Sequence, residues 1–158
     1  IESSFNSISV HFSEIFETLF PGGKGSLSFT DKTNILETGI EISVQPRGKK
    51  VKKLSLLSGG ERSLAAIAFL FSIFKSFPSP FYILDEVEAA LDDANLHRMI
   101  NLLDKIKEDA QYIIVTHQQQ TMHAGDVLYG VTMEPGSGSR VFTKTKEDFE
   151  SLIGTNEK

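Results

Sequence analysis

Apolar residues along this chain follow two spacings, and each spacing predicts a different kind of element. Over residues 1–20 they recur at helical spacing, which predicts a helix with one apolar stripe. Over residues 24–29 and 39–45 they alternate with polar residues, which predicts two short strands, antiparallel if they pair. A long helix from Ser58 to Phe77 is apolar on nearly every side, so we expect other elements to bury most of it.

The second half of the chain alternates strands with helices. Continuous apolar runs at 81–84 and 111–115 predict strands that are buried on both faces, as in the centre of a parallel sheet. The remaining expected elements are helices at 94–107 and 118–124, strands at 127–133 and 140–143, and a terminal helix at 144–153. This order predicts an α/β fold with a mostly parallel sheet flanked by helices, antiparallel strands near the N-terminus and a C-terminal hairpin.

Composition narrows the class of protein. The 158 residues suffice for one compact domain, and they include no cysteine, which excludes disulfides and thiolate metal sites and fits a reducing compartment. No apolar run approaches the roughly 20 residues of a membrane span, and the N-terminus lacks a signal-peptide pattern. Because Ile1 is not a start methionine, we expect a piece of a longer chain.

Charge is distributed unevenly along the sequence. The formal net charge of −5 argues against a general nucleic-acid binder. A basic cluster nevertheless precedes the long helix, and it comprises Arg47, Lys49, Lys50, Lys52 and Lys53. This basic cluster either contacts DNA phosphates or forms a solvated strand edge that discourages aggregation.

Polar residues follow the two apolar strands. Asp85 and Glu86 come directly after the run at 81–84, and Thr116–His117 follow the run at 111–115. Because the carboxyl ends of neighbouring parallel strands face one crevice, we expect Asp85 and His117 to face a common ligand. A carboxylate in this position can hold Mg²⁺, and its neighbour can polarise an attacking water. The alternative is structural: the carboxylates end a strand and cap the next helix, and the histidine serves the packing.

A glycine turn, Ser58-Gly59-Gly60, opens the long helix. Two glycines let backbone N–H groups approach a ligand closely, and a helix N-terminus carries partial positive charge, so the turn suits a phosphate. Ser58 is also a favourable N-cap, so an ordinary helix start is the alternative. Asp92 and Asp93 likewise either cap the following helix or form a loop that contacts a partner subunit.

Four segments, in this order and spacing, resemble the motifs of ABC-type ATPases. They are the signature motif at Leu57–Glu61, the Walker B strand at Phe81–Glu86, the D-loop at Ala90–Asp93 and the switch histidine at Thr116–His117. Finer details, among them Leu128–Met133, resemble the C-terminal head segment of SMC proteins, the chromosome-maintenance ATPases, and most closely the bacterial form. The resemblance covers nearly the whole chain.

The resemblance implies that ATP and Mg²⁺ bind between two heads. Asp85 would help to hold Mg²⁺, Glu86 would orient or activate the attacking water, and His117 would contact the γ-phosphate. The opposite head would contribute its signature and D-loop residues, which are Ser58, Gly59, Gly60, Glu61, Asp92 and Asp93. Hydrolysis would part the heads and so drive DNA entrapment or movement.

The sequence contains no phosphate loop of the form G-x-x-x-x-G-K-[ST]. Residues 21–26 look similar but have the wrong spacing and follow a predicted helix instead of a strand. In SMC proteins this loop lies in an N-terminal segment, which a long coiled coil separates from the C-terminal one. The resemblance therefore implies half of an ATPase, inactive by itself.

The resemblance also implies a domain arrangement and partners. Residues 1–20 would continue a coiled coil into the head, 21–153 would form the C-terminal half of the head, and 154–158 would be a flexible tail. Expected partners are the N-terminal head segment, a second SMC head, a kleisin subunit and DNA, at the nucleoid in the cytoplasm. The competing hypotheses are a head segment of a DNA-repair coiled-coil ATPase, a transporter nucleotide-binding domain, and a non-catalytic interaction module.

Overall fold

The computed structural model describes residues 2–31, 33–34, 36–45, 47–48, 52–133, 136 and 138–148. The chain divides into two compact units, Ile1–Val115 and Thr116–Lys158. The predicted tail, the second half of the predicted terminal helix (149–153), and Lys49 and Lys50 of the basic cluster lie outside the described residues.

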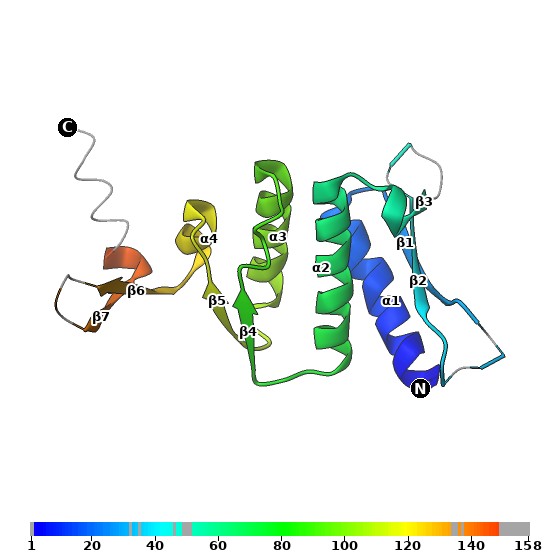
Figure 1. The fold of residues 1–158 in the computed structure, drawn as a ribbon, viewed down its shortest axis with the longest axis horizontal. Coiled ribbons are helices and arrows are strands. Elements are labelled where there is room, and N and C mark those ends of the chain that lie inside the picture. Colours follow the sequence, from blue (N-terminus) through cyan, green and yellow to red (C-terminus); the bar gives the residue numbers. More distant parts are fainter. Residues whose placement is uncertain are drawn as a thin grey trace. The chain divides into compact units, whose positions relative to one another are not determined.

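The first unit begins with a helix packed on an antiparallel sheet. Helix α1 (Glu2–Leu19) lies between the sheet and the next helix (Figure 1). The strands β1 (Lys24–Phe29) and β2 (Ile40–Gln45) pair antiparallel, as predicted, and β3 (Lys52–Lys53) extends the sheet beside β2. A 3₁₀ turn, η1 (Leu54–Leu56), follows, and neither β3 nor η1 was predicted.

The contact between α1 and the sheet is closely packed. Phe12 and Phe16 of α1 and Val44 of β2 are fully buried. A methyl group added at Gly25 of β1 would lie only 2.6 Å from Cγ of Phe16. The absence of a side chain at Gly25 therefore lets the strand approach the two aromatic rings, which closes this layer against water.

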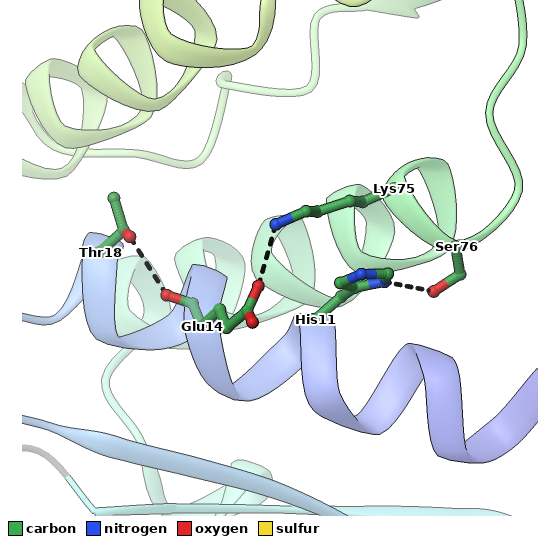
Figure 2. Close-up of polar contacts among 5 residues, drawn as sticks. All are labelled: His11, Glu14, Thr18, Lys75 and Ser76. Carbon is green, nitrogen blue, oxygen red and sulfur yellow. Dashed lines mark hydrogen bonds and ion pairs between the residues drawn. The ribbon is translucent and has the colours of Figure 1, made fainter.

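The central helix α2 (Gly59–Ser76) is buried along most of its length, as its sequence predicted. Phe69 packs edge-on against Phe12 of α1, with ring centroids 6.3 Å apart. Two polar contacts join the same helices, as Figure 2 shows. Ser76 Oγ lies 2.8 Å from Nδ1 of His11, and Lys75 Nζ donates to Glu14 Oε2 over 2.9 Å, which lowers the pKa of Glu14.

A parallel strand pair completes the first unit. Strand β4 (Phe81–Asp85), helix α3 (Asp93–Ile106) and strand β5 (Gln111–Val115) form a β-α-β unit in which Asp85 pairs with Val115. The inner face of the pair packs on α2, because Tyr82 stacks on Phe74 with ring centroids 4.1 Å apart. Burial on this face raises the pKa of Tyr112 to about 12.

The prediction that β4 and β5 are buried on both faces was wrong for the chain by itself. On the outer face Phe81 is 53% exposed, Ile83 63%, Ile113 45% and Val115 51%. The reason is physical: alternate residues of a strand point to opposite faces, and the helices of this unit cover only one of them. The outer face is an apolar surface with no cover among the described residues, and we call it the open face.

The second unit contains a short helix and a hairpin. Helix α4 (Gln119–Ala124) precedes strands β6 (Val127–Met133) and β7 (Ser139–Thr145), which pair antiparallel as predicted. The pair Gly130 and Phe142 is close: a methyl group at Gly130 would overlap the ring of Phe142. Thr145 and Asp148 hydrogen-bond reciprocally at the start of the helical residues 146–148.

The predicted mixed α/β class is confirmed. Antiparallel strands lie near the N-terminus and in the C-terminal hairpin, and parallel pairing among the described residues is confined to β4 and β5. Element boundaries among the described residues agree with the predicted ones to within two residues, and β7 extends to Thr145, so the predicted helix at 144–153 begins only at residue 146. Among the described residues, every helix is too short or too polar to cross a membrane.

Candidate functional site

The carboxyl ends of β4 and β5 lie side by side. Asp85 pairs with Val115, and the backbone N–H of Glu86 donates to the carbonyl of Val115 over 3.0 Å. The strand ladder therefore continues one residue beyond β4 and delivers two exposed carboxylates at the tip. The structure confirms the predicted placement of these two carboxylates at the end of a parallel strand.

The backbone of Glu86 adopts a left-handed conformation, with φ of 48°. For a residue with a Cβ atom this conformation costs roughly 1–2 kcal/mol of free energy, because the Cβ crowds the following carbonyl. The conformation ends the extended backbone of β4 at this residue. Strain of this kind concentrates at functional sites, where the surrounding structure enforces it.

His117 lies two residues beyond β5, at the start of the second unit. Its side chain is exposed, and its Nε2 lies 3.4 Å from Nε2 of Gln118. Because His117 and Asp85 belong to different units, their sharing of one ligand remains a prediction.

The glycine turn forms a capping box at the start of α2. Ser58 is the N-cap, and its Oγ accepts a hydrogen bond from the N–H of Glu61 over 3.4 Å. Glu61 Oε2 in turn accepts from the N–H of Ser58 over 3.3 Å and from its hydroxyl over 3.1 Å. The ordinary helix start, which was the alternative to a phosphate site, is therefore present. The carboxylate of Glu61 accepts hydrogen bonds from the N–H and O–H groups that Ser58 would otherwise donate to a phosphate.

An arginine holds the segment before the glycine turn. Arg62 Nη2 donates to the carbonyl of Leu57 over 3.3 Å and to that of Ser55 over 3.5 Å. These bonds connect the first turn of α2 to the end of η1. Sequence reasoning did not single out Arg62, because its partners are backbone carbonyls, which leave no pattern in a sequence.

Asp92 meets the glycine turn from the neighbouring helix. It is the N-cap of α3, and its Oδ1 accepts from the N–H of Asn95 over 2.9 Å. A methyl group at Gly60 would lie 3.2 Å from Asp92 Oδ2 and 3.1 Å from Asn95 Nδ2. The structure thus brings two predicted site segments together. Asp93, the first residue of α3, is exposed, and its role at a subunit contact remains a prediction.

Of the described residues of the basic cluster, Lys52 and Lys53 form a strand at a sheet edge and Arg47 lies in a turn. Lys53 belongs to the edge strand β3, and its Nζ lies 2.6 Å from Glu41 Oε1 on β2. The bond to Glu41 raises the pKa of Lys53. A charged edge strand agrees with the protective alternative. Contact with DNA remains a prediction.

The residues at these positions could supply some, but not all, of the contacts that a nucleotide and Mg²⁺ require. Mg²⁺ is commonly held by one or two carboxylates together with substrate phosphates, and the exposed carboxylate of Asp85 suits one such position. Within the described residues, no group of three or more acidic, histidine or cysteine side chains could hold a metal by itself. The glycine turn offers free space at Gly59, where an added methyl group would meet no atom within 4 Å. A phosphate could therefore approach the backbone there.

Comparison with known proteins gives a consistent result. A family model described as the RecF/RecN/SMC N terminal domain matches residues 6–140. The chromosome partition protein Smc of Mycolicibacterium paratuberculosis is 54% identical over 131 residues, which make up 83% of this chain and 11% of that protein. The chain therefore spans a small part of the curated relatives that it matches.

Solved structures share both fold and sequence with this chain. One, from a study described as the structural biochemistry of ATP-driven dimerization and DNA stimulated activation of SMC ATPases, matches with a TM-score of 0.84 and 38% identity, covering 99% of this chain and 94% of that one. Another, the Smc head domain with an extended coiled coil bound to the C-terminal domain of ScpA from Pyrococcus furiosus, matches with a TM-score of 0.79 and 38% identity. It covers 98% of this chain and 38% of that one.

Proposed function

Because the chain belongs to the RecF/RecN/SMC family, we propose that it forms the C-terminal half of the ATP-hydrolysing head of a chromosome-partition protein. The matching family model is described as an N-terminal domain, so the comparisons do not support the C-terminal position. The motifs support it instead. The sequence contains a signature-type glycine turn and a Walker B-type strand end but no phosphate loop.

The observation that carries the proposal is the pairing of β4 with β5. Their parallel register places Asp85 and Glu86 at the strand tip, where α/β proteins bind ligands. The strained backbone of Glu86 lies at the position expected for the residue that activates water. The open face, with Phe81, Ile83 and Ile113, is apolar and uncovered. This supports the proposal that another segment of the head covers it and brings the phosphate loop.

Each residue at the strand ends has a defined task in this proposal. Asp85 holds Mg²⁺, which neutralises charge on the phosphates when bound. Glu86 orients the attacking water and accepts its proton. His117 contacts the γ-phosphate.

The glycine turn serves the nucleotide of the opposite head. Ser58, Gly59 and Gly60 direct N–H and O–H groups at its γ-phosphate, and Asp92 and Asp93 line the interface between heads. Glu61 must then release the two Ser58 donors that it holds in the capping box. Hydrolysis removes the phosphate that bridges the heads, so that they separate and move or entrap DNA.

The expected partners follow from the same relatives. The Smc head of Pyrococcus furiosus binds the C-terminal domain of ScpA, and we expect a kleisin subunit of this kind to bind the protein that contains this chain. A head of a DNA-repair coiled-coil ATPase is the second candidate, since the family description includes RecF and RecN. The chromosome partition protein Smc of Mycolicibacterium paratuberculosis, 54% identical, favours the first.

Reconstitution tests the proposal. The chain should hydrolyse ATP only when it is combined with the segment that carries the phosphate loop, and Glu86→Gln should abolish most turnover while the heads still associate in ATP. Ser58→Arg should block association and leave ATP binding by a single head intact. Measurements are phosphate release, ATP binding and head association by light scattering.

Three results would contradict the proposal. Absence of hydrolysis in the reconstituted wild-type head would favour a non-catalytic module. Normal turnover in the Glu86→Gln variant would remove Glu86 from the role. Loss of ATP binding in the Ser58→Arg variant would mean that the glycine turn belongs to the nucleotide site of its own head.

A further inference from the structure

We propose that Asn95 is a positioning residue that fixes the glycine turn of α2 to the loop ahead of α3, so that both meet the opposite head as one rigid surface. The inference rests on the proposed function, because it concerns how the two segments meet a nucleotide bound by the other head. Asn95 belongs to none of the four motifs, and its role follows from its contacts.

The side-chain amide of Asn95 is buried and held at both ends. Asn95 is 6% exposed, its Nδ2 donates to Asp92 Oδ2 over 3.2 Å, and its Oδ1 accepts from Arg98 Nη1 over 3.3 Å. A carboxylate only accepts and a guanidinium only donates, so a flipped amide would lose both bonds. The two neighbours therefore select one orientation of Asn95.

The Asp92–Asn95 pair supports one glycine of the turn and not the other. A methyl group at Gly60 would lie 3.1 Å from Asn95 Nδ2 and 3.2 Å from Asp92 Oδ2, closer than ordinary carbon contacts. A methyl group at Gly59 would meet no atom within 4 Å. Gly60 therefore packs against the pair, while Gly59 faces free space where a phosphate can approach.

In this arrangement the position of the glycine turn depends on the position of the Asp92 side chain in the loop ahead of α3. Asp92 receives the backbone N–H of Asn95 and the amide of the same residue, so its carboxylate is fixed in direction. Movement of that carboxylate would open the packing at Gly60. Loss of the Asn95 amide should therefore weaken association between heads and leave ATP binding by a single head unchanged.

A reciprocal exchange tests the role in the full-length protein that contains this chain. Asn95→Asp places two carboxylates against each other and should raise the protein concentration needed for ATP-dependent head association about tenfold, as expected for losing a hydrogen bond to a charged group. The double variant Asp92→Asn with Asn95→Asp restores one donor and one acceptor, and asparagine remains a good N-cap. Because Asp92 itself lines the proposed interface, the single variant Asp92→Asn is the reference, and the double variant should associate within about threefold of it.

Hydrogen exchange provides a second measurement that requires no nucleotide. Gly60→Ala should accelerate exchange of the amides at 92–95, because the added methyl group displaces the Asp92–Asn95 pair. Gly59→Ala is the matched control at the neighbouring position and should leave those amides unchanged. Equal protection in the two variants would overturn the proposed support of Gly60.

Two association results would overturn the role of Asn95. One is failure of the double variant to recover to the level of the Asp92→Asn variant. The other is a fall in single-head ATP affinity as large as the loss of association in Asn95→Asp. If the wild-type heads did not associate in ATP at all, the proposed function would fail and this role in association with it, while hydrogen exchange would still decide whether Asn95 supports the turn.

Discussion

The two sheets of the first unit differ in the face that each leaves exposed: β1 exposes Lys24, Ser26 and Ser28, whereas β4 and β5 expose apolar side chains. The antiparallel sheet packs on α1 through Val44, which is fully buried, and through Gly25, which brings the strand against Phe16. The parallel pair is covered on one face only, and on the other Ile83 is 63% exposed. The first layer is therefore complete within the chain, whereas the second is a surface prepared for another segment.

This difference separates two kinds of apolar residue. Those of the antiparallel layer stabilise the chain by itself. Those of the open face can stabilise only an assembly, since their burial depends on a segment that the described residues do not contain. Substitutions in the two places should consequently have different dependence on the rest of the protein.

The largest effect should come from the closed layer. Phe16→Ala removes a fully buried ring from between α1 and β1 and should lower the free energy of unfolding by about 3–5 kcal/mol. Urea denaturation of the chain alone and of the full-length protein should give the same loss. Phe81→Ala, at the open face, is the matched control and should change the chain alone by less than about 0.5 kcal/mol. Equal losses in the two variants of the chain alone would end the distinction between the layers.

An intermediate effect should appear at the open face only when it is covered. Ile83→Ser should leave the stability of the chain alone nearly unchanged and reduce its self-association. In the full-length protein it should cost about 2–4 kcal/mol, because the side chain is then buried. Leu84→Ser, one residue on and already buried, should destabilise both forms. If Ile83→Ser had no effect in the full-length protein, the open face would not be an interface.

The smallest effect concerns the contact between α1 and α2 shown in Figure 2. Lys75 lowers the pKa of Glu14 below its ordinary value of 4.5, so this contact stabilises the fold above that pH and stops doing so as the pH falls through the lowered pKa. Glu14→Gln should therefore cost about 0.5 kcal/mol near neutral pH, a small amount because both side chains are exposed, and nothing in strong acid.

The control for this pH dependence lies on the same helix. Glu17 makes no hydrogen bond or ion pair with any described residue, so Glu17→Gln should show no such change. Unfolding midpoints of the wild type and both variants, compared across pH, measure the difference. A cost of Glu14→Gln that grew as the pH fell would contradict the assignment.

Much of the fold could be predicted because the spacing of apolar residues depends only on local geometry. The stripe on α1, the alternation in β1 and β2, and the glycine turn that opens α2 each identified an element. The prediction failed where it concerned what covers an element. The run at 81–84 showed that β4 is apolar on both faces, but whether both are buried depends on segments outside the described residues.

The candidate site could be predicted only as far as its chemistry is carried by residue type. Asp85, Glu86 and Ser58 were identified because carboxylates after a strand and a serine with glycines before a helix are uncommon arrangements. Arg62 and Asn95 were given no role because their partners, a backbone carbonyl five residues away and a capping carboxylate three residues away, leave no distinctive pattern in a sequence. Only the approach of the Asp92–Asn95 pair to Gly60 requires that the starts of α2 and α3 lie side by side.

At Glu86, with its left-handed backbone, the residue that best suits the backbone differs from the residue that the proposed hydrolysis requires. Glycine would adopt this conformation without crowding, and it would also remove the carboxylate that the proposed hydrolysis needs. The substitution most favourable to the backbone is thus the one that would abolish the proposed hydrolysis. Selection for a sturdier protein and selection for faster turnover should therefore act in opposite directions at this single position.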